Sequence, residues 1–260
     1  MSFSTPIGIL AGVAIVLWSL FGEVKNTSVF FNVHSIGIVL GGTLATALVC
    51  LSFTQLKDIF IVLMKQFTGE KKRVRIEVIK EIVRLSLMIK KGESLDSEIN
   101  EIKIPFLKEG LELYLDGSFS KDELVEILEK RVEVQNSRYR REGMTFKVIG
   151  KFPPAFGLIG ATLGMIGLLQ GLGAPNAFEQ LGPAMSVALT STFWGLVLAN
   201  VILLPLGENL HMAAEEDLIM REIVIDGVLL LKDKKHPLLV QENLNSYLAP
   251  KDRLNIYEGK

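Results

Sequence analysis

The sequence predicts an all-α, polytopic integral membrane protein with four transmembrane helices and a helical cytoplasmic domain. Hydrophobic residues make up 49% of its 260 residues. Charged residues are absent from four long windows, and the basic residues gather outside them. A soluble core helix seldom runs so far without a charge, so the windows favour membrane spans. They cover residues 1–22, 26–56, 152–178 and 180–207.

Each window is long enough for one span, because a transmembrane helix needs about 20 mostly apolar residues. The first window has no basic segment before it and no clear small-residue cleavage site at its end, so we interpret it as a retained span and not as a signal peptide. The predicted spans are residues 4–22, 34–53, 154–173 and 184–206.

The basic residues predict the topology. Of the 28 Lys and Arg residues, 20 lie between residues 57 and 151 and seven between residues 221 and 260, whereas Lys25 is the only one in the first turn. Positive charge stays on the cytoplasmic side, so both termini and the long central segment should be cytoplasmic. The predicted parts are transmembrane hairpins at 1–56 and 152–207, a helical cytoplasmic domain at 57–151 and a helical cytoplasmic tail at 208–260.

The cytoplasmic parts should also be helical. Residues 74–89 place Ile79 and Val83 on one apolar stripe with charges elsewhere, which is typical of an amphipathic helix. A second helix over 105–115 would begin at its proline. Ser120 and Glu123 then have the spacing of a capping box at the start of a third helix.

Ordinary catalytic and metal-binding patterns are missing from the sequence. One Cys and three His give no zinc spacing, and no GxxxxGK[ST] phosphate loop or paired nucleophile and base is present. The net charge of -1 suggests no nucleic-acid partner. We therefore expect no enzyme activity, no catalytic residues, no metal and no cofactor.

The spans do contain small and hydroxyl side chains. The glycines of 157–171 recur every three or four residues, which puts them on one face for close helix approach. Ser191 and Thr192 lie in the fourth span. These residues either pack helices together or line a hydrated ion path. A proton-driven machine normally needs an ionisable group in the membrane, so under the second interpretation a partner chain must supply it. Otherwise the chain is a scaffold or a passive pore.

Five segments resemble the MotA/PomA family of flagellar stator subunits, and the resemblance runs essentially from end to end. The segments are SIGIVLGGT (35–43), PFLKEGLELYLDG (105–117), PAFGLIGATLG (154–164), GPAMSVALTSTFWGLVLANVILLP (182–205) and IDGVLLL (225–231).

The resemblance implies an assembly. Five copies would surround two copies of a MotB-type partner, whose single span carries an ion-binding aspartate, in the lipid of the bacterial inner membrane. The ring would push the rotor protein FliG. Pro154 and Pro205 match the functional prolines of spans three and four, and Thr192 matches the threonine facing the partner's aspartate. Ser191 would lie on the same ion pathway, and the span-three glycines would admit the partner helix.

The coupling ion is predicted from two positions. Sodium-type relatives usually have threonine where this chain has Ala161, and often an acid where it has Asn32. Sodium must be recoordinated by oxygen atoms when it loses water, so a missing hydroxyl disfavours it. Thr162 points about 100° away from Ala161 on a helix and is no substitute. We therefore expect protons.

The rotor-facing charges follow the resemblance less closely. Leu95-Asp96 matches the family's Leu-acid pair, but the stretch 88–99 is one residue short. The basic role falls to Lys90 or Lys91, and the arginine position itself is open, with Ile89 as one alignment. In the tail, Arg221 and Asp226 match charged positions of the family.

Two other functions remain open at this point. An ExbB- or TolQ-like energiser of another envelope machine usually has three spans, which the tight first hairpin argues against. A non-transporting membrane scaffold would tolerate substitution of Thr192 and Pro154 wherever packing is kept.

Overall fold

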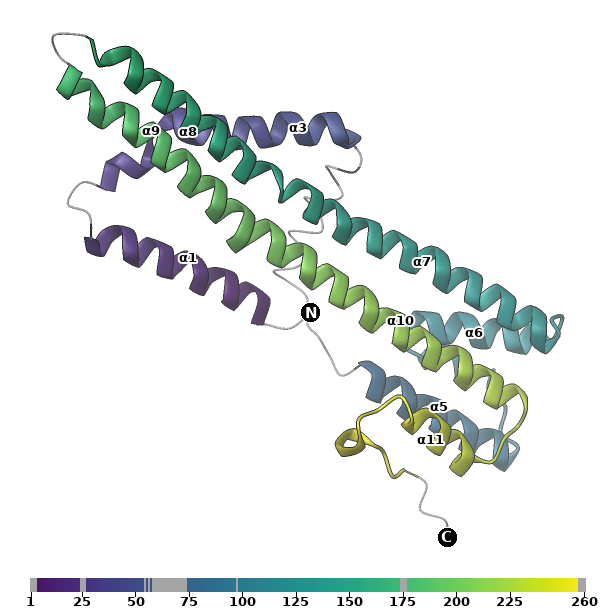
Figure 1. Ribbon diagram of the computed structural model, residues 1–260. Helices are drawn as coiled ribbons and strands as arrows, with labels where there is room; N and C mark the ends of the chain where they lie inside the picture. The colour runs from purple at the N-terminus through teal and green to yellow at the C-terminus, as the bar shows by residue number, and fades with distance from the viewer. Residues whose placement is uncertain are drawn as a thin grey trace. The chain divides into compact units, whose positions relative to one another are not determined.

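The computed structural model describes residues 4–23, 27–53, 55, 57, 74–96, 98–173 and 177–256, and every regular element among them is helical (Figure 1). The predicted all-α class is therefore confirmed. The chain divides into two compact units. One combines Met1–Glu70 with Arg140–His211, and the other combines Lys71–Tyr139 with Met212–Lys260. Both predicted transmembrane hairpins fall in the first unit, which we call the membrane unit. We call the second the cytoplasmic unit, after the side of the membrane that the sequence predicts for it.

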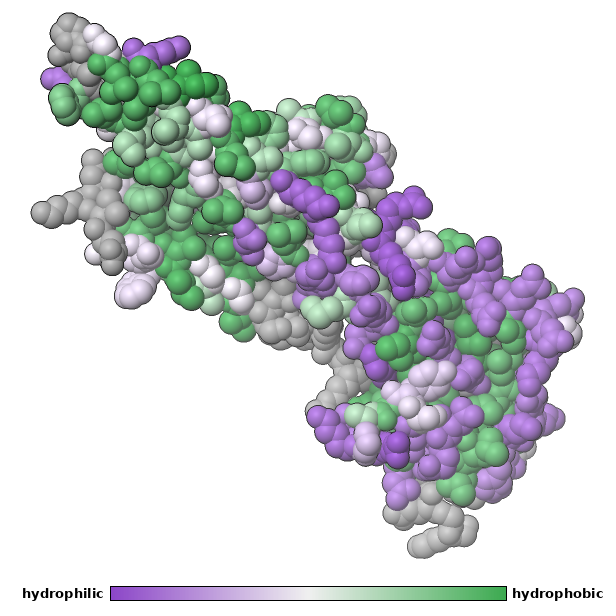
Figure 2. Space-filling view, viewed as in Figure 1, coloured by the Kyte–Doolittle hydropathy of each residue, from purple (hydrophilic) through white to green (hydrophobic). Residues whose placement is uncertain are grey.

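The membrane unit is built from apolar helices that match the charge-free windows. Figure 2 shows mainly hydrophobic residues over the visible face of these helices. The elements are α1 (Ser4–Glu23), η1 (Thr27–Phe31), α2 (Val33–Ile36), η2 (Gly37–Gly41), α3 (Gly42–Cys50), α8 (Phe152–Gly171), α9 (Ala177–Val197) and η4 (Leu198–Leu203).

The second span is bounded by local signals. Asn32 caps its start, because the side-chain oxygen accepts a hydrogen bond from the His34 backbone N–H at 2.9 Å. The helix ends at Cys50, where the next residue, Leu51, is extended with φ −126° and ψ 145°. The prediction of 34–53 is therefore too long at its C-terminal end, because an apolar window does not show where the backbone leaves the helical region.

Two spans contain a π-helical segment, η2 in the second span and η4 in the fourth. Pro205 is the second residue of α10 (Leu204–Lys232), directly after η4. Because Pro205 has no backbone N–H, it cannot make the regular bond to the preceding turn, and the wider π-turn lies just before it. Pro154 is in the first turn of α8, where a missing N–H is tolerated.

Three helical stretches of the described chain are long and apolar enough to cross a membrane. They are Val33–Cys50 and parts of Lys121–Gly171 and Leu181–Lys232. The first helix is apolar over Ile7–Gly22, which is shorter than the other three. The prediction of membrane-spanning helices is confirmed for these three, and the predicted first span, residues 4–22, stays a prediction.

The cytoplasmic unit has its own core. Ile79 and Ile82 of α5 (Val74–Lys91), Leu107 of α6 (Pro105–Asp116) and Leu128 of α7 (Lys121–Ile149) are completely buried. α5 lies beside α11 (Pro237–Asn245) in Figure 1. Short 3-10 turns η3 (Ile99–Glu101) and η5 (Pro250–Asp252) complete the unit, together with part of α10.

The predicted start signals of the cytoplasmic helices are present. α6 begins at Pro105, and the residue after its last, Gly117, has a φ of 71° that suits glycine. The Ser120 backbone N–H donates to Glu123 Oε2 at 2.8 Å, and the Glu123 N–H donates to Ser120 Oγ at 3.2 Å. This reciprocal pair is a capping box, so that prediction is confirmed.

Candidate functional site

The glycine face of α8 packs against α9 of the same chain, and the two helices lie side by side in Figure 1. A Cβ added at Gly157 would lie 2.9 Å from the Ser191 carbonyl oxygen, and one at Gly164 would lie 2.7 Å from the Ala184 carbonyl oxygen. These glycines therefore allow backbone-to-backbone approach within the chain. α9 occupies the space beside Gly157 and Gly164, and the contact of the glycine face with a partner helix stays a prediction. Gly167 has open space around it.

Thr192 lies at the edge of this helix pair. Its hydroxyl is 3.2 Å from the Ala188 carbonyl oxygen on its own helix and 3.4 Å from the Gly157 carbonyl oxygen on α8. The side chain is half-buried. A hydroxyl that donates its proton to a backbone carbonyl keeps its oxygen lone pairs as acceptors. Thr192 can therefore accept a hydrogen bond from a protonated group that approaches the edge.

Pro154 and Ala161 share the same side of α8. They are seven residues apart, which is close to two helical turns, and Gly157 lies between them on that stripe. Both are partly exposed. Because Thr192 reaches the Gly157 carbonyl, the helix pair brings Pro154, Ala161 and Thr192 to one edge. Their role in ion movement stays a prediction.

Ser191 and Pro205 lie away from this edge. Ser191 is completely buried, and its hydroxyl donates to the Val187 carbonyl oxygen at 2.6 Å. A Cβ at Gly160 would collide with the Ser191 side chain, so Ser191 fills the helix contact. Pro205 follows η4, at the other end of the span from Pro183. Nothing in the position of Ser191 supports an ion-pathway role.

The structure also shows two arrangements of buried hydroxyl groups that the sequence analysis did not predict. Ser35 Oγ of the second span lies 2.6 Å from Thr190 Oγ1 of α9, and both side chains are buried. Thr43 is also buried, and its Oγ1 has no hydrogen-bond partner among the described residues. The Ser35–Thr190 pair joins positions 155 residues apart, and no local spacing predicts such a contact.

The first group of predicted rotor-facing charges lies in the last turn of α5 and in the residues that follow it. Lys90 Nζ is 2.9 Å from Nε2 of His236, the residue that caps α11. Lys91 is exposed. Asp96 is also exposed, and its Oδ2 accepts a 2.6 Å hydrogen bond from Ser94 Oγ. Leu95 and Ile89 pack into the core, so Ile89 takes no part in a charged surface.

Arg221 and Asp226 are held by other groups of the cytoplasmic unit. Arg221 Nε donates to Asp217 Oδ2 at 2.6 Å, and its guanidinium lies 4.7 Å from the centre of the Phe106 ring. Asp226 Oδ2 accepts a 2.7 Å hydrogen bond from the Tyr247 hydroxyl. Burial, followed by the bond to Asp226, raises the pKa of Tyr247. Both charges therefore have a structural role.

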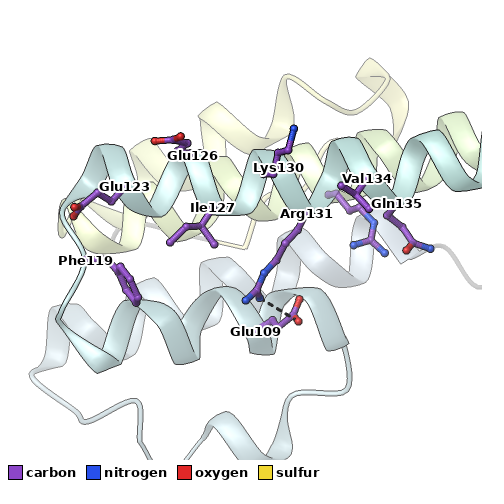
Figure 3. A pocket seen from close by; sticks show the side chains of 10 residues that line it. Glu109, Phe119, Glu123, Glu126, Ile127, Lys130, Arg131, Val134 and Gln135 are labelled. Carbon is purple, nitrogen blue, oxygen red and sulfur yellow. Dashed lines mark ion pairs between the residues drawn. The ribbon is translucent and has the colours of Figure 1, made fainter.

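The part of α10 that carries Arg221 also lines an open groove of about 900 Å³ in the cytoplasmic unit. Figure 3 shows the groove between α6 and α7, where Arg131 Nη1 lies 3.1 Å from Glu109 Oε1. Phe119, Ile127 and Val134 give it apolar surface. Acidic and basic side chains both line it, so the groove suits a partner of mixed charge. They are Glu109, Glu123, Glu126, Lys130, Arg131 and Arg221. The sequence analysis did not single it out.

No group of three or more His, Cys, Asp or Glu side chains that could hold a metal ion occurs among the described residues. The arrangement of helices agrees closely with solved structures. The MotAB stator complex from Bacillus subtilis matches with a TM-score of 0.85 at 24% identity, covering 95% of this chain and 96% of that chain. The C. jejuni MotAB structure matches with a TM-score of 0.84 at 21% identity, covering 99% and 100%. These two likenesses establish the fold.

Sequence relatives decide the family. Residues 98–223 match the MotA/TolQ/ExbB proton channel family. The uncharacterized protein YtxD of Bacillus subtilis is 30% identical over 251 residues, 95% of this chain and 89% of that protein. The chemotaxis protein PomA of Vibrio alginolyticus is 28% identical, over 95% of this chain and 96% of PomA. The chain belongs to the MotA/PomA family. The similarity to PomA extends along nearly the whole length of both proteins. The chain is therefore a subunit of the flagellar stator ion-channel class.

Proposed function

We propose that this chain is the ring-forming subunit of a flagellar stator in the bacterial inner membrane. Five copies would surround two MotB-type subunits, and ion flow would turn the ring against the rotor protein FliG. The near-full-length similarity to motility proteins carries the proposal. Both termini and the segment 57–151 would lie in the cytoplasm. The proposal includes no enzymatic reaction and no bound cofactor.

The MotB-type subunit would supply the ionisable carrier. The charge-free windows of this chain contain hydroxyl groups but no Asp, Glu, Lys or Arg, and a proton path through a membrane needs an ionisable group. A protonated aspartate of the partner could donate to Thr192 at the edge of α8 and α9. Loss of that proton would remove the hydrogen bond and leave a charge, which favours a new position of the partner against the ring.

The proposed ion is a proton. Ala161 offers no side-chain oxygen on the stripe that carries Pro154, while dehydrated sodium needs several oxygen ligands. A proton needs only an acceptor and a hydrated route. The exposed Lys91 and Asp96, with Lys90 beside them, are the proposed rotor contacts. Arg221 and Asp226 would contribute where they reach the surface of the cytoplasmic unit.

A motility assay tests both the stator function and the ion. The chain and its cognate MotB-type partner would be produced in a stator-deleted host, and swimming speed followed across external sodium at fixed pH. We expect sodium-independent swimming that stops when an uncoupler collapses the proton gradient. Swimming speed that rises with external sodium would support the stator function but contradict the assignment of protons as the coupling ion. No swimming with both proteins in the membrane would favour an ExbB- or TolQ-like energiser.

Replacement of Thr192 distinguishes a stator from a scaffold. Thr192→Val keeps the side-chain shape but removes the hydroxyl, whereas Thr192→Ser keeps the hydroxyl. We expect swimming to be lost in the valine variant and largely retained in the serine variant, with equal amounts of both in the membrane. The stability change should stay near 1 kcal/mol, the typical net value of one hydrogen bond. Normal swimming of Thr192→Val would support the scaffold.

A further inference from the structure

An apolar pocket of about 230 Å³ lies between the second and fourth spans of the membrane unit. Both π-helices contribute to its wall, because Val39 and Leu40 belong to η2 and Leu198 and Ile202 belong to η4. Val39 is almost completely buried, while Leu40 is half exposed. The pocket therefore has a closed floor and an open mouth. π-Helical turns are rare and are often found at functional sites.

The lining of the pocket offers no free polar side-chain group to a ligand. All eight side chains that line it are apolar. Its only polar side-chain group, the Trp194 indole N–H, donates to the Phe30 carbonyl oxygen at 2.6 Å. The ring of Phe31 packs beside Trp194 with 5.9 Å between ring centres. The occupant must accordingly be apolar where it meets these walls.

The lining also differs from a helix-docking surface. Helices in membranes associate through small residues and through interhelical hydrogen bonds, as α8 and α9 do here. The pocket contains only Phe, Trp, Ile, Leu and Val side chains. A helix of a second copy would find neither close backbone approach nor a polar partner. A thin, flexible hydrocarbon can follow such a wall.

We propose that this pocket binds an acyl chain of a membrane lipid. Its volume exceeds the roughly 150 Å³ of an apolar protein cavity that takes up benzene, and acyl chains are the solvent at this depth of a bilayer. The bound chain fills the space between the two π-helices. It contacts the helix that carries Thr192 and supports the turns before Pro205. The inference requires membrane insertion and is independent of stator function.

Fluorescence quenching by brominated lipids tests the site. The protein has two tryptophans, so Trp18→Phe leaves Trp194 as the only source of tryptophan fluorescence. The full-length variant would be reconstituted in phosphatidylcholine vesicles with bromine at one of several depths on the acyl chain. We expect strong quenching of Trp194 with a clear optimum depth. In the Trp18→Phe background, Leu198→Phe should fill the pocket and remove most of the quenching.

Matched controls separate the pocket from ordinary lipid contact. Leu189→Phe makes the same exchange on α9 at an exposed position outside the pocket and should leave the quenching of Trp194 unchanged. Trp194→Phe leaves only Trp18, an exposed α1 residue, whose quenching should not respond to Leu198→Phe if the variant is folded. Weak quenching of Trp194 at every depth, or equal effects of both leucine variants, would overturn the lipid site. Weak quenching with crosslinking between copies from a cysteine at Leu40 would assign the pocket to a second copy.

Discussion

Lys91 and Asp96 differ from Arg221 and Asp226 in how far their own chain holds them. The first two are exposed, and the only contact of Asp96 described above is with nearby Ser94. Arg221 and Asp226 bond to groups of the same unit. Exposed ion pairs contribute about 1 kcal/mol or less, which suits contacts that form and break in each step. Substitution of Asp226 should therefore affect folding as well as any rotor contact.

Removal of the Tyr247 hydroxyl tests this structural role. Tyr247→Phe should lower the free energy of unfolding by about 1 kcal/mol, because half-buried Asp226 loses its donor. The raised pKa of Tyr247 favours the neutral phenol, so its contribution is complete below the ordinary tyrosine pKa of about 10 and declines as the pH rises above it. Chemical unfolding between pH 8 and pH 11 would measure this. Tyr114→Phe, in the same core, is the control and should keep the pH profile of the original chain.

The contact of α8 with α9 depends on the absence of side chains at a few positions of one helix. Gly164 faces the backbone of α9, whereas Gly167, three residues later on α8, faces open space. The backbone of α9 cannot move away as a flexible side chain can. The two glycines therefore have different roles despite their equal fit to the sequence pattern.

Exchange of these glycines for alanine should have opposite results. Gly164→Ala should destabilise the chain by about 1–3 kcal/mol, as overpacking does. Gly167→Ala should be neutral or stabilise by up to about 1 kcal/mol, since alanine favours a helix. Thermal unfolding of the full-length protein in one detergent would compare them. A similar fall in both unfolding temperatures would contradict the assignment of the contact to Gly164.

The capping box makes the start of α7 sensitive to acid. The hydrogen bond from the Ser120 backbone lowers the pKa of Glu123. The resulting stabilisation is complete above the ordinary glutamate pKa and is lost as the pH falls below about 4. Ser120→Ala should cost about 1 kcal/mol. Glu123→Gln keeps an acceptor but cannot ionise, so unfolding from pH 7 to pH 3 should show a smaller pH dependence in this variant.

At the scale of the whole molecule, the distribution of charge is the clearest constraint. Long apolar helices account for the membrane unit, and charged residues surround a separate core in the cytoplasmic unit. The same asymmetry predicts which segments face the cytoplasm. Topology can be tested independently of motility, because Cys50 is the only cysteine.

In a Cys50→Ser background, single cysteines should report the two sides of the membrane. Phe178→Cys replaces an exposed residue at the start of α9 and should react with an impermeant maleimide in cells whose outer membrane has been opened. Lys130→Cys, at an exposed position of α7, should react only after the inner membrane is broken. The reverse pattern would place the termini outside the cytoplasm.

Local features of the structure could largely be predicted from the sequence. Pro105 and the capping box predict the starts of α6 and α7, because these signals act within one turn of the chain. The apolar windows predict where the spans lie but not their ends, since α9 begins at Ala177, before the predicted start at 184. The break at Leu51 depends on backbone angles, for which the apolar window holds no signal.

The candidate site was less predictable. The Ser35–Thr190 contact joins distant segments. The glycine pattern predicted a close helix contact but not which helix makes it, since a face of small residues has the same appearance for either partner. The pocket between η2 and η4 depends on side chains of both spans and on the π-turns, which no single periodicity predicts.

The glycine face of α8 also bears on biosynthesis. α8 leaves the ribosome before α9, so Gly157 and Gly164 are exposed until the next helix has been made. During that interval, lipid would meet bare backbone on one side of α8 and could not pack against it as closely as α9 does. We therefore expect α8 to stay at the insertion machinery until α9 has been made, so that the two helices enter the bilayer together as a hairpin.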